Sequence, residues 1–190
     1  MKRLLVSALL FTAISFSQEF RLGSKVGDFS VNDLTGKSVS FSDLKGSTTV
    51  VIFISTNCPI SNSYNDRMNA LYRDYSPKGV HFVFINSNVN EPPDQVREHA
   101  KRVGFAFPVY KDQQNKVADM FGAMATPETY VIDSTGTIRY HGYIDDSSAE
   151  ARVTRQGLRN ALDDVLAGKE VDRPETKAFG CTIKRGRQTS

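Results

Sequence analysis

Two cysteines, Cys58 and Cys181, are the residues of this chain best suited to redox chemistry. Cys58 comes at the end of an apolar run and is followed at once by Pro59. A dithiol motif of the Cys-x-x-Cys type would place its second cysteine three residues after the first, but that position holds Ser61. Disulfide chemistry at Cys58 must therefore use a distant partner or an external thiol, because no second sulfur is close in sequence.

Cys58 lies where a strand is predicted to end and a helix to begin. The run TTVVIFIS from Thr48 is apolar and β-branched, as expected for a strand buried on both faces. Pro59 suits the first turn of a helix, where its missing N–H costs nothing. A helix N-terminus favours a thiolate over a thiol, and reactive groups gather at the carboxyl ends of strands in open sheets. We therefore predict a reactive Cys58, with a buried, inert cysteine as the alternative.

The residues around Cys58 are small and polar, namely Ser55, Thr56, Asn57 and Ser61. This composition favours an exposed turn over a packed core around the sulfur. We expect Ser55, Thr56, Pro59 and Ser61 to contact a substrate bound at Cys58.

The remaining sequence predicts alternating strands and helices. A helix should follow Cys58, because apolar and aromatic residues recur at spacings of three and four before Pro77 and Gly79. A buried strand is predicted over 80–88 and a helix over 91–104. A short extended segment over 107–112 and a short helix ending at Gly122 come next. Parallel central strands joined through helices are the expected result.

The second half of the chain predicts a β-hairpin and a last helix. The hairpin is expected over 129–133 and 137–145, around the turn STG. Apolar spacing places the last helix from Ser148 to its stop at Gly168. The tail 169–190 looks irregular but contains Cys181. The fold class is therefore α/β, with a central mixed sheet flanked by helices and a short N-terminal β prelude.

The first 17 residues have the features of a secretory signal peptide. Lys2 and Arg3 precede an apolar run that is too short to span a bilayer comfortably, and the small-x-small sequence Ser15-Phe16-Ser17 follows. An uncleaved anchor or a buried first helix is the alternative. We expect export to a periplasm or the outside medium, where a disulfide persists, and no membrane contact by the mature form. The expected divisions are a signal peptide at 1–17, one domain at 18–168 and a tail at 169–190.

Thr126-Pro127 stands immediately before the first strand of the hairpin, which is an unusual place for proline. Because only X-Pro bonds adopt the cis form at low cost, a cis turn is predicted at this point.

Taken together, these elements resemble the thioredoxin fold, and more narrowly the redoxin branch that comprises the AhpC/TSA (alkyl hydroperoxide reductase and thiol-specific antioxidant), or peroxiredoxin-like, group. The resemblance rests on NCP at Cys58, ATP at Pro127, the prelude KVGDFSVNDLTGKSVSFSDLKG and the tail ETKAFGCTIKR, which is similar to a C-terminal GC-x-I-K segment. It covers about residues 24 to 185, and the NCP and GCTIK pair is its most specific part. The prelude lacks the proline of the redoxin opening.

The resemblance implies a role for each matching residue. Cys58 matches the nucleophilic cysteine, and Ser61 stands where a resolving cysteine would be. Pro127 matches the proline whose preceding residue, Thr126, lies beside the reactive sulfur and pairs its backbone with a bound peptide or thiol.

A peroxide-reducing site would need further residues. Peroxiredoxins carry P-x-x-x-T-x-x-C, and here Ser55 supplies a hydroxyl while Val51 stands at the proline position. Arg139 and Arg155 are candidates for an arginine beside the thiolate by elimination only. Thiol-dependent peroxide reduction is therefore the second interpretation, after thiol–disulfide exchange.

Three roles for Cys181 remain open. It resolves a mixed disulfide or sulfenic acid at Cys58, it forms a permanent structural bridge, or it lies far from Cys58 and pairs between chains. The sequence does not bring a distant tail within disulfide range.

Other chemistries lack their motifs. His81, His99 and His141 are not at metal-ligand spacing, and a copper-chaperone site would need a second cysteine near Cys58. DLTGKS is too short for a phosphate loop, and no Gly-x-Ser-x-Gly is present. We expect no metal or other cofactor, and a formal net charge of +3 does not indicate nucleic acid.

The sequence thus predicts an exported thiol–disulfide oxidoreductase with Cys58 as nucleophile, and of the three roles for Cys181 it favours the resolving one. The expected partners are a protein or small-molecule disulfide or thiol, or a peroxide, together with an external thiol reductant. A redoxin-fold binding module without turnover is the non-enzymatic alternative.

Overall fold

Two long apolar strands form the centre of the sheet in this computed structural model, which describes residues 19–186. They are β3 (Thr48–Ile54) and β4 (Val80–Asn86), and they pair in parallel. Side chains of β3 alternate between two hydrophobic clusters, Val50 and Ile52 on one face and Val51 and Phe53 on the other. The prediction of strands buried on both faces is confirmed.

The sheet has seven strands in the order β2-β1-β5-β4-β3-β7-β8. Strands β4 and β5 also pair in parallel, whereas β7 pairs antiparallel with β3 and β8, and β1 pairs antiparallel with β2 and β5. The bounds of the outer strands are β1 (Ser30–Asn32), β2 (Ser38–Ser40), β5 (Val109–Lys111), β7 (Glu128–Ile132) and β8 (Ile138–Gly142). The predicted mixed sheet, its hairpin and the β prelude are all confirmed.

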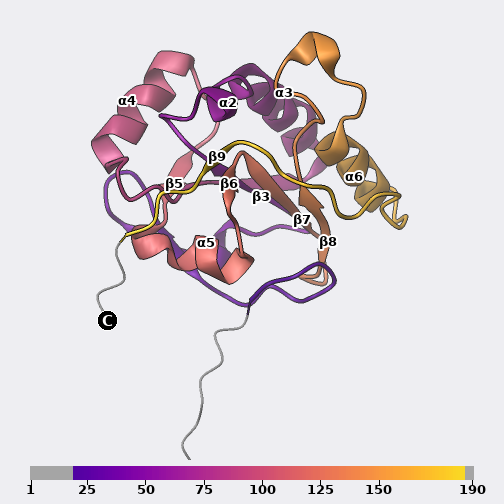
Figure 1. Ribbon diagram of the computed structural model, residues 1–190. Helices are drawn as coiled ribbons and strands as arrows, with labels where there is room; N and C mark the ends of the chain where they lie inside the picture. The colour runs from indigo at the N-terminus through magenta and orange to yellow at the C-terminus, as the bar shows by residue number, and fades with distance from the viewer. Residues whose placement is uncertain (1–18, 187–190) are drawn as a thin grey trace, which may run out of the picture.

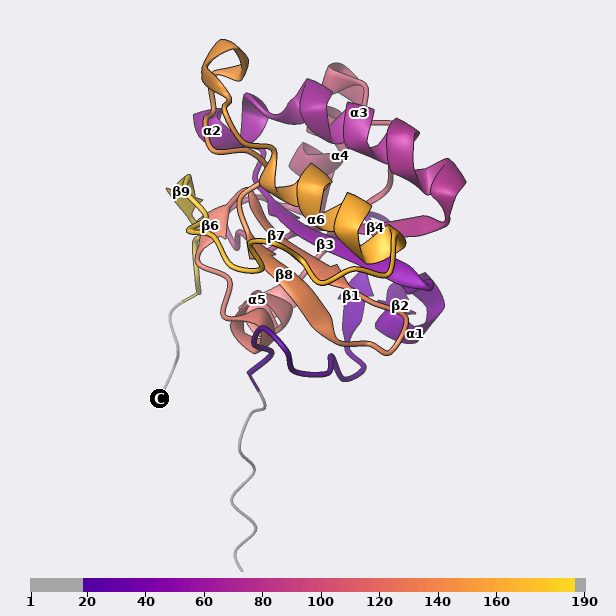
Figure 2. The same ribbon diagram turned by 90° about the vertical axis from the view of Figure 1, so that its right-hand side faces the viewer.

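Helices cover both faces of this sheet, as Figures 1 and 2 show. Helices α3, α4 and α6 lie on one face, and α5 lies on the other (Figure 2). The helices are α1 (Phe41–Leu44), α2 (Pro59–Asn62), α3 (Asn65–Tyr75), α4 (Pro93–Val103), α5 (Lys116–Phe121) and α6 (Gly157–Leu166), with short 3-10 turns at Ser76–Lys78, Gln113–Asn115 and Glu150–Arg152. Within the described residues, no helix is long and apolar enough to cross a membrane.

The last helix begins later than its apolar spacing predicts. Residues from Ser148 form a 3-10 turn and a loop, and α6 begins only at Gly157. The loop is fixed by Asp146, whose carboxylate accepts hydrogen bonds from the backbone N–H and the hydroxyl of Thr154. Glycine is required at the helix start, because a Cβ there would lie 2.4 Å from the hydroxyl oxygen of Tyr140.

The tail crosses the end of the sheet where β3 finishes (Figure 1). It contributes β9 (Cys181–Thr182), which pairs antiparallel with β6 (Ala125–Thr126) in a separate two-stranded sheet. Part of the tail expected to be irregular is therefore a short strand. The predicted signal peptide lies outside the described residues.

Candidate active site

Cys58 is held at the carboxyl end of β3, as its position in the sequence predicts. It is the N-cap of α2, and its Sγ accepts a hydrogen bond from the backbone N–H of Ser61 at 3.3 Å. Its own N–H donates to Ser55 Oγ at 3.1 Å. Pro59 occupies the first helical position, as expected. The turn therefore points the sulfur at a backbone donor, which stabilises negative charge on it.

The expectation of an exposed turn around Cys58 is wrong. Cys58 is 2% exposed, Ser61 is 1% exposed, and Ser55 and Thr56 are also buried, whereas Asn57 is exposed. Ser55 and Ser61 are buried here because internal hydrogen bonds satisfy their hydroxyl groups. Ser61 Oγ, for example, accepts from the backbone N–H of Ser55 at 3.1 Å.

Glu91 is the residue that organises this turn. Its buried carboxylate accepts hydrogen bonds from the Ser55 hydroxyl at 2.6 Å and from the backbone N–H groups of Thr56 and Asn57 at 2.9 and 3.0 Å. The side-chain amide of Asn86 also donates to it. Burial pushes the pKa of Glu91 upward, but these hydrogen bonds outweigh burial and hold its pKa below the ordinary value. An ionised Glu91 thus fixes the backbone that carries Cys58.

Lys111 supports the same network from β5. Its buried ammonium donates to Asn86 Oδ1 at 2.7 Å and to the carbonyl oxygens of Glu91 and Asn88 at 2.8 and 3.0 Å. Burial lowers the pKa of Lys111 to about 8, although Glu91 and Asp112 oppose this shift. Asn86 therefore joins a buried cation to a buried anion directly beneath the cysteine turn.

Thr126 and Pro127 lie against the sulfur from the other side. The Thr126–Pro127 bond is cis, as predicted, and the Thr126 carbonyl oxygen lies 3.5 Å from Cys58 Sγ. Glu128 holds this loop, because its buried carboxylate accepts from the backbone N–H groups of Met124 and Ala125 at 2.8 and 2.9 Å. The hydrogen bonds of the cysteine turn and of the Thr126–Pro127 loop thus position the sulfur next to the Thr126 carbonyl.

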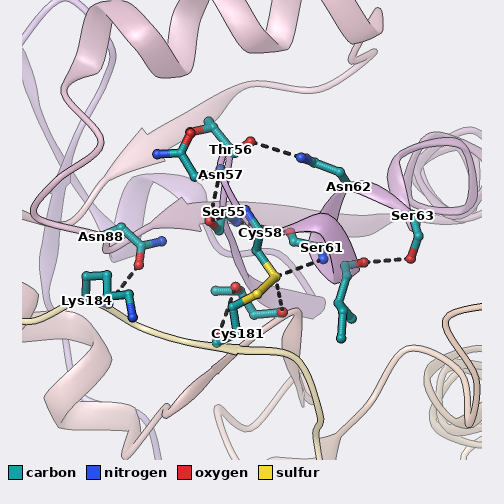
Figure 3. Close-up of a disulfide and its surroundings, with 12 residues drawn as sticks. Ser55, Thr56, Asn57, Cys58, Ser61, Asn62, Ser63, Asn88, Cys181 and Lys184 are labelled. Carbon is teal, nitrogen blue, oxygen red and sulfur yellow. Dashed lines mark hydrogen bonds between the residues drawn. A yellow bond between two sulfur atoms is a disulfide. The ribbon is translucent and has the colours of Figure 1, made fainter.

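Cys181 forms a disulfide with Cys58, with the two Cα atoms 5.7 Å apart (Figure 3). Strand pairing sets this distance, because Cys181 lies opposite Thr126 in the β6–β9 ladder. The predicted approach of the tail to Cys58 is confirmed, and pairing between chains is not what the structure shows. The two cysteines lie 123 positions apart in the sequence, so their disulfide joins the tail to the end of β3.

Further contacts of both side chains and backbone hold the tail beyond Cys181. Ile183 is 2% exposed and belongs to the hydrophobic cluster on the α5 face of the sheet. The backbone N–H of Lys184 donates to Asn88 Oδ1 at 2.8 Å, a contact drawn in Figure 3. Arg185 pairs with Asp119 at 2.9 Å. Because Asn88 also donates to Glu91, the tail and the cysteine turn share one hydrogen-bond network.

The other residues singled out in the sequence lie elsewhere. Arg139 pairs with Asp133 and Arg155 with Asp172, whereas the hydrogen-bond and disulfide partners of Cys58 Sγ are Ser61, Thr126 and Cys181. His141 Nε2 donates to the Glu128 carboxylate at 2.6 Å, behind the Thr126–Pro127 loop. Among residues 19–186, no three His, Cys, Asp or Glu side chains form a metal-binding group.

Sequence reasoning missed Glu91, Glu128 and Lys111, although each is buried beside the site. Glu128 directly follows Pro127, so its position next to the predicted cis turn was a usable signal. Glu91 begins the predicted helix segment EPPDQ, where its carboxylate was indistinguishable from an ordinary first-turn acid.

Comparisons with known proteins agree with this geometry. The protein-family model described as AhpC/TSA family matches residues 22–141. Thiol-disulfide oxidoreductase ResA of Geobacillus thermodenitrificans (strain NG80-2) is 31% identical over 140 residues, which are 72% of this chain and 79% of that protein.

Solved structures show the same fold. An uncharacterized conserved protein from Geobacillus kaustophilus has 32% identity and a TM-score of 0.82, covering 90% of this chain and 95% of that chain. The thioredoxin domain of a thiol-disulfide oxidoreductase from Bacteroides vulgatus has 20% identity and a TM-score of 0.55, covering 63% of this chain and 86% of that chain. The second likeness concerns the fold alone, and it confirms the predicted thioredoxin-like architecture.

Proposed function

Because this chain belongs to the AhpC/TSA family, we propose that it is an exported thiol–disulfide oxidoreductase in which Cys58 attacks and Cys181 resolves. The observation that carries the proposal is the disulfide between Cys58 and Cys181, the two cysteines of the sequence. Relatives named thiol-disulfide oxidoreductase support the reaction class. The predicted signal peptide at 1–17 supports export, with 18–168 as the catalytic domain and 169–190 as the tail.

The reaction begins with the reduced protein. The Cys58 thiolate attacks one sulfur of a substrate disulfide, a new sulfur–sulfur bond forms, and the other substrate sulfur leaves as a thiolate that takes a proton from water. The N–H of Ser61, which lies 3.3 Å from Cys58 Sγ in the disulfide form, is the donor that stabilises the thiolate. Substrate contacts are assigned to Ser55, Thr56, Pro59, Ser61, Thr126 and Pro127.

Resolution follows when the Cys181 thiolate attacks Cys58 Sγ. The bond between Cys58 and the substrate breaks, and the substrate leaves as a second thiol after taking a proton. In total, two electrons have passed from the two protein cysteines to the substrate disulfide, which is reduced, and the protein is left oxidised as the Cys58–Cys181 disulfide. An external thiol reductant returns the protein to its starting state.

Peroxide reduction remains the second candidate, because Ser55 stands where peroxiredoxins carry a hydroxyl. The hydroxyl proton of Ser55 is directed at Glu91, 2.6 Å away, instead of toward the sulfur. This arrangement favours disulfides over peroxides as substrates.

The test is a comparison of Cys58→Ser and Cys181→Ser proteins acting on oxidised glutathione. We expect Cys58→Ser to form no adduct, and Cys181→Ser to accumulate a mixed disulfide on Cys58 that mass spectrometry detects. The unmodified protein should pass through this adduct to the Cys58–Cys181 disulfide. Turnover by Cys181→Ser at the rate of the unmodified protein would contradict the resolving role, and an unreactive Cys58 would favour the binding-module alternative.

A further inference from the structure

The tail and any substrate cysteine need the same place beside Cys58. Cys58 Sγ lies 3.5 Å from the carbonyl oxygen of Thr126, and β9 occupies the edge that Thr126 offers. The backbone N–H of Ile183 donates to the Met124 carbonyl at 3.0 Å, and the Thr126 hydroxyl donates to the Cys181 carbonyl at 3.4 Å. A chain bonded to Cys58 would run along this edge in the same way, since edge pairing uses backbone groups that every sequence has.

We infer, as an inference that rests on the proposed function, that residues 180–183 occupy the substrate site of their own protein. Their sequence then shows which sequence this site selects in a substrate. The substrate is an extended polypeptide segment with the pattern Gly-Cys-x-aliphatic, whose cysteine is part of a disulfide. It pairs with Met124 and Thr126 in place of β9.

The position before the cysteine accepts only glycine. Gly180 has φ of +155°, and a Cβ placed on it would lie 1.9 Å from the carbonyl oxygen of Thr126 and 2.7 Å from its carbonyl carbon. Both atoms are backbone atoms of the loop that Glu128 holds, so they cannot move aside as a flexible side chain would. Any side chain at this position would push the segment off the edge.

The position two residues after the cysteine accepts an aliphatic side chain. Ile183 is buried, whereas Thr182 and Lys184 on either side of it are exposed, which is the alternation of a strand with one face inward. Ile183 enters the hydrophobic cluster that includes Val117 and Ala123. The site therefore selects side chains at two positions and leaves those between and after them free.

The rim of the site favours a polypeptide over a small disulfide. Met124 and Val89 are 58% and 47% exposed, and they are two of the four large apolar side chains exposed in the described part of the chain. The Val89 N–H donates to the Lys184 carbonyl at 3.1 Å, and the Met124 carbonyl accepts from Ile183, so the two residues flank the tail. An extended chain contacts both of them, whereas a small thiol bound at Cys58 alone gains neither contact.

Shared occupancy couples resolution to product release. When the Cys181 thiolate attacks Cys58 Sγ, the Cys58–substrate bond breaks and the substrate leaves as a thiolate that takes a proton from water. In the same event, the backbone of Ile183 takes the hydrogen-bond position at Met124 that the substrate held. The reduced product is thus displaced by the tail and cannot rebind while the disulfide lasts.

The test uses the reduced, full-length Cys181→Ser protein and a set of eight-residue peptides. The reference peptide is Ala-Phe-Gly-Cys-Thr-Ile-Lys-Arg, the sequence of residues 178–185, with its cysteine in a mixed disulfide with thionitrobenzoate. Three variants replace its glycine by alanine, its isoleucine by serine or, as matched control, its threonine by serine. The tail of the protein competes equally with every peptide, so the ratios of rates are unaffected.

We expect the reference and control peptides to react at least about tenfold faster than the alanine and isoleucine-to-serine variants. The free energy gained by burying one aliphatic side chain corresponds to a factor of about that size. Thionitrobenzoate release gives the rate, and mass spectrometry places the adduct on Cys58. Equal rates for all four peptides, or adducts with oxidised glutathione but with no peptide, would overturn the inference and leave the proposed function intact. Absence of any Cys58 adduct, with peptides and glutathione alike, would refute the proposed function itself.

Discussion

The two halves of the Cys58–Cys181 bridge are held very differently. Cys58 is 2% exposed and lies in a turn that a buried carboxylate fixes through three donors of residues 55–57. Cys181 is partly exposed and lies in a strand of two residues, followed by one buried side chain, Ile183. A preorganised, buried sulfur facing a more exposed partner in a short strand is what a bridge that opens and closes requires. A permanent staple would need no such asymmetry.

The contrast is sharpest if the two sides are weakened separately. On the Cys58 side, Glu91→Gln places an amide N–H₂ where an oxygen accepts two hydrogen bonds, so buried donors lose their acceptor. We expect the free energy of unfolding to fall by about 2–3 kcal/mol in urea denaturation. Glu98→Gln, at an exposed position on α4, is the matched control and should change it by less than about 0.5 kcal/mol. Equal stabilities for the two variants would mean that Glu91 does not hold the turn.

On the tail side, Gly180→Ala should weaken the bridge without unfolding the domain. The added Cβ meets the Thr126 carbonyl, and the left-handed backbone is strained for alanine. We expect the equilibrium constant for closing the Cys58–Cys181 disulfide in glutathione buffers to fall about 30-fold, which corresponds to about 2 kcal/mol. Gly186→Ala is the control, because its Cβ would lie 3.8 Å from Val89 in ordinary contact. The prediction fails if both variants close the disulfide as the unmodified protein does.

A smaller change probes the anchor of the tail. Ile183→Val removes one buried methylene, which costs about 1 kcal/mol in a packed cluster. We expect disulfide closure to weaken about fivefold, while the stability of the reduced domain stays within about 0.5 kcal/mol of its original value. Thr182→Ser, at the exposed neighbouring position, should leave closure unchanged. A loss of domain stability as large as the loss of closure would show that the tail is part of the core in both redox states.

The smallest expected effect is a pH dependence of the Glu91 contribution. The pKa of Glu91 is below its ordinary value in the folded protein, so the unfolded chain takes up its proton first as pH falls. The stabilisation is therefore complete above the unfolded pKa and is lost as pH falls through the folded pKa. The stability difference between the unmodified protein and Glu91→Gln, measured from pH 7 downward, should shrink below about pH 4.5. A difference that stays constant to acid pH would mean that charge on Glu91 is unimportant.

Local signals in the sequence were enough to predict much of this arrangement. β-branched runs predicted β3 and β4, and the order of elements predicted the mixed sheet. Cys58 followed from its place between strand and proline, and the cis bond followed from a proline ahead of a strand. These features depend on neighbouring residues, which is why a single sequence contains them.

The rest depends on contacts between distant residues. Glu91 reaches Ser55 across 36 positions, and no local pattern shows that its carboxylate is buried under the cysteine turn. Without that acceptor, the Ser55 hydroxyl and the backbone N–H groups of residues 56 and 57 look like those of an exposed turn, which is why this expectation was wrong. The tail register likewise depends on Gly180 fitting against Thr126, a contact set by tertiary structure alone.

The central claim is that the bridge between Cys58 and Cys181 is redox-active, and a thiol-trapping redox titration of the full chain tests it most directly. Samples equilibrated in glutathione or dithiothreitol buffers are alkylated and weighed by mass spectrometry. We predict one intramolecular disulfide with a midpoint between about −120 and −270 mV, the range of catalytic thiol oxidoreductases. A midpoint below about −300 mV would identify a structural staple, and two free thiols under oxidising buffers would contradict the account outright.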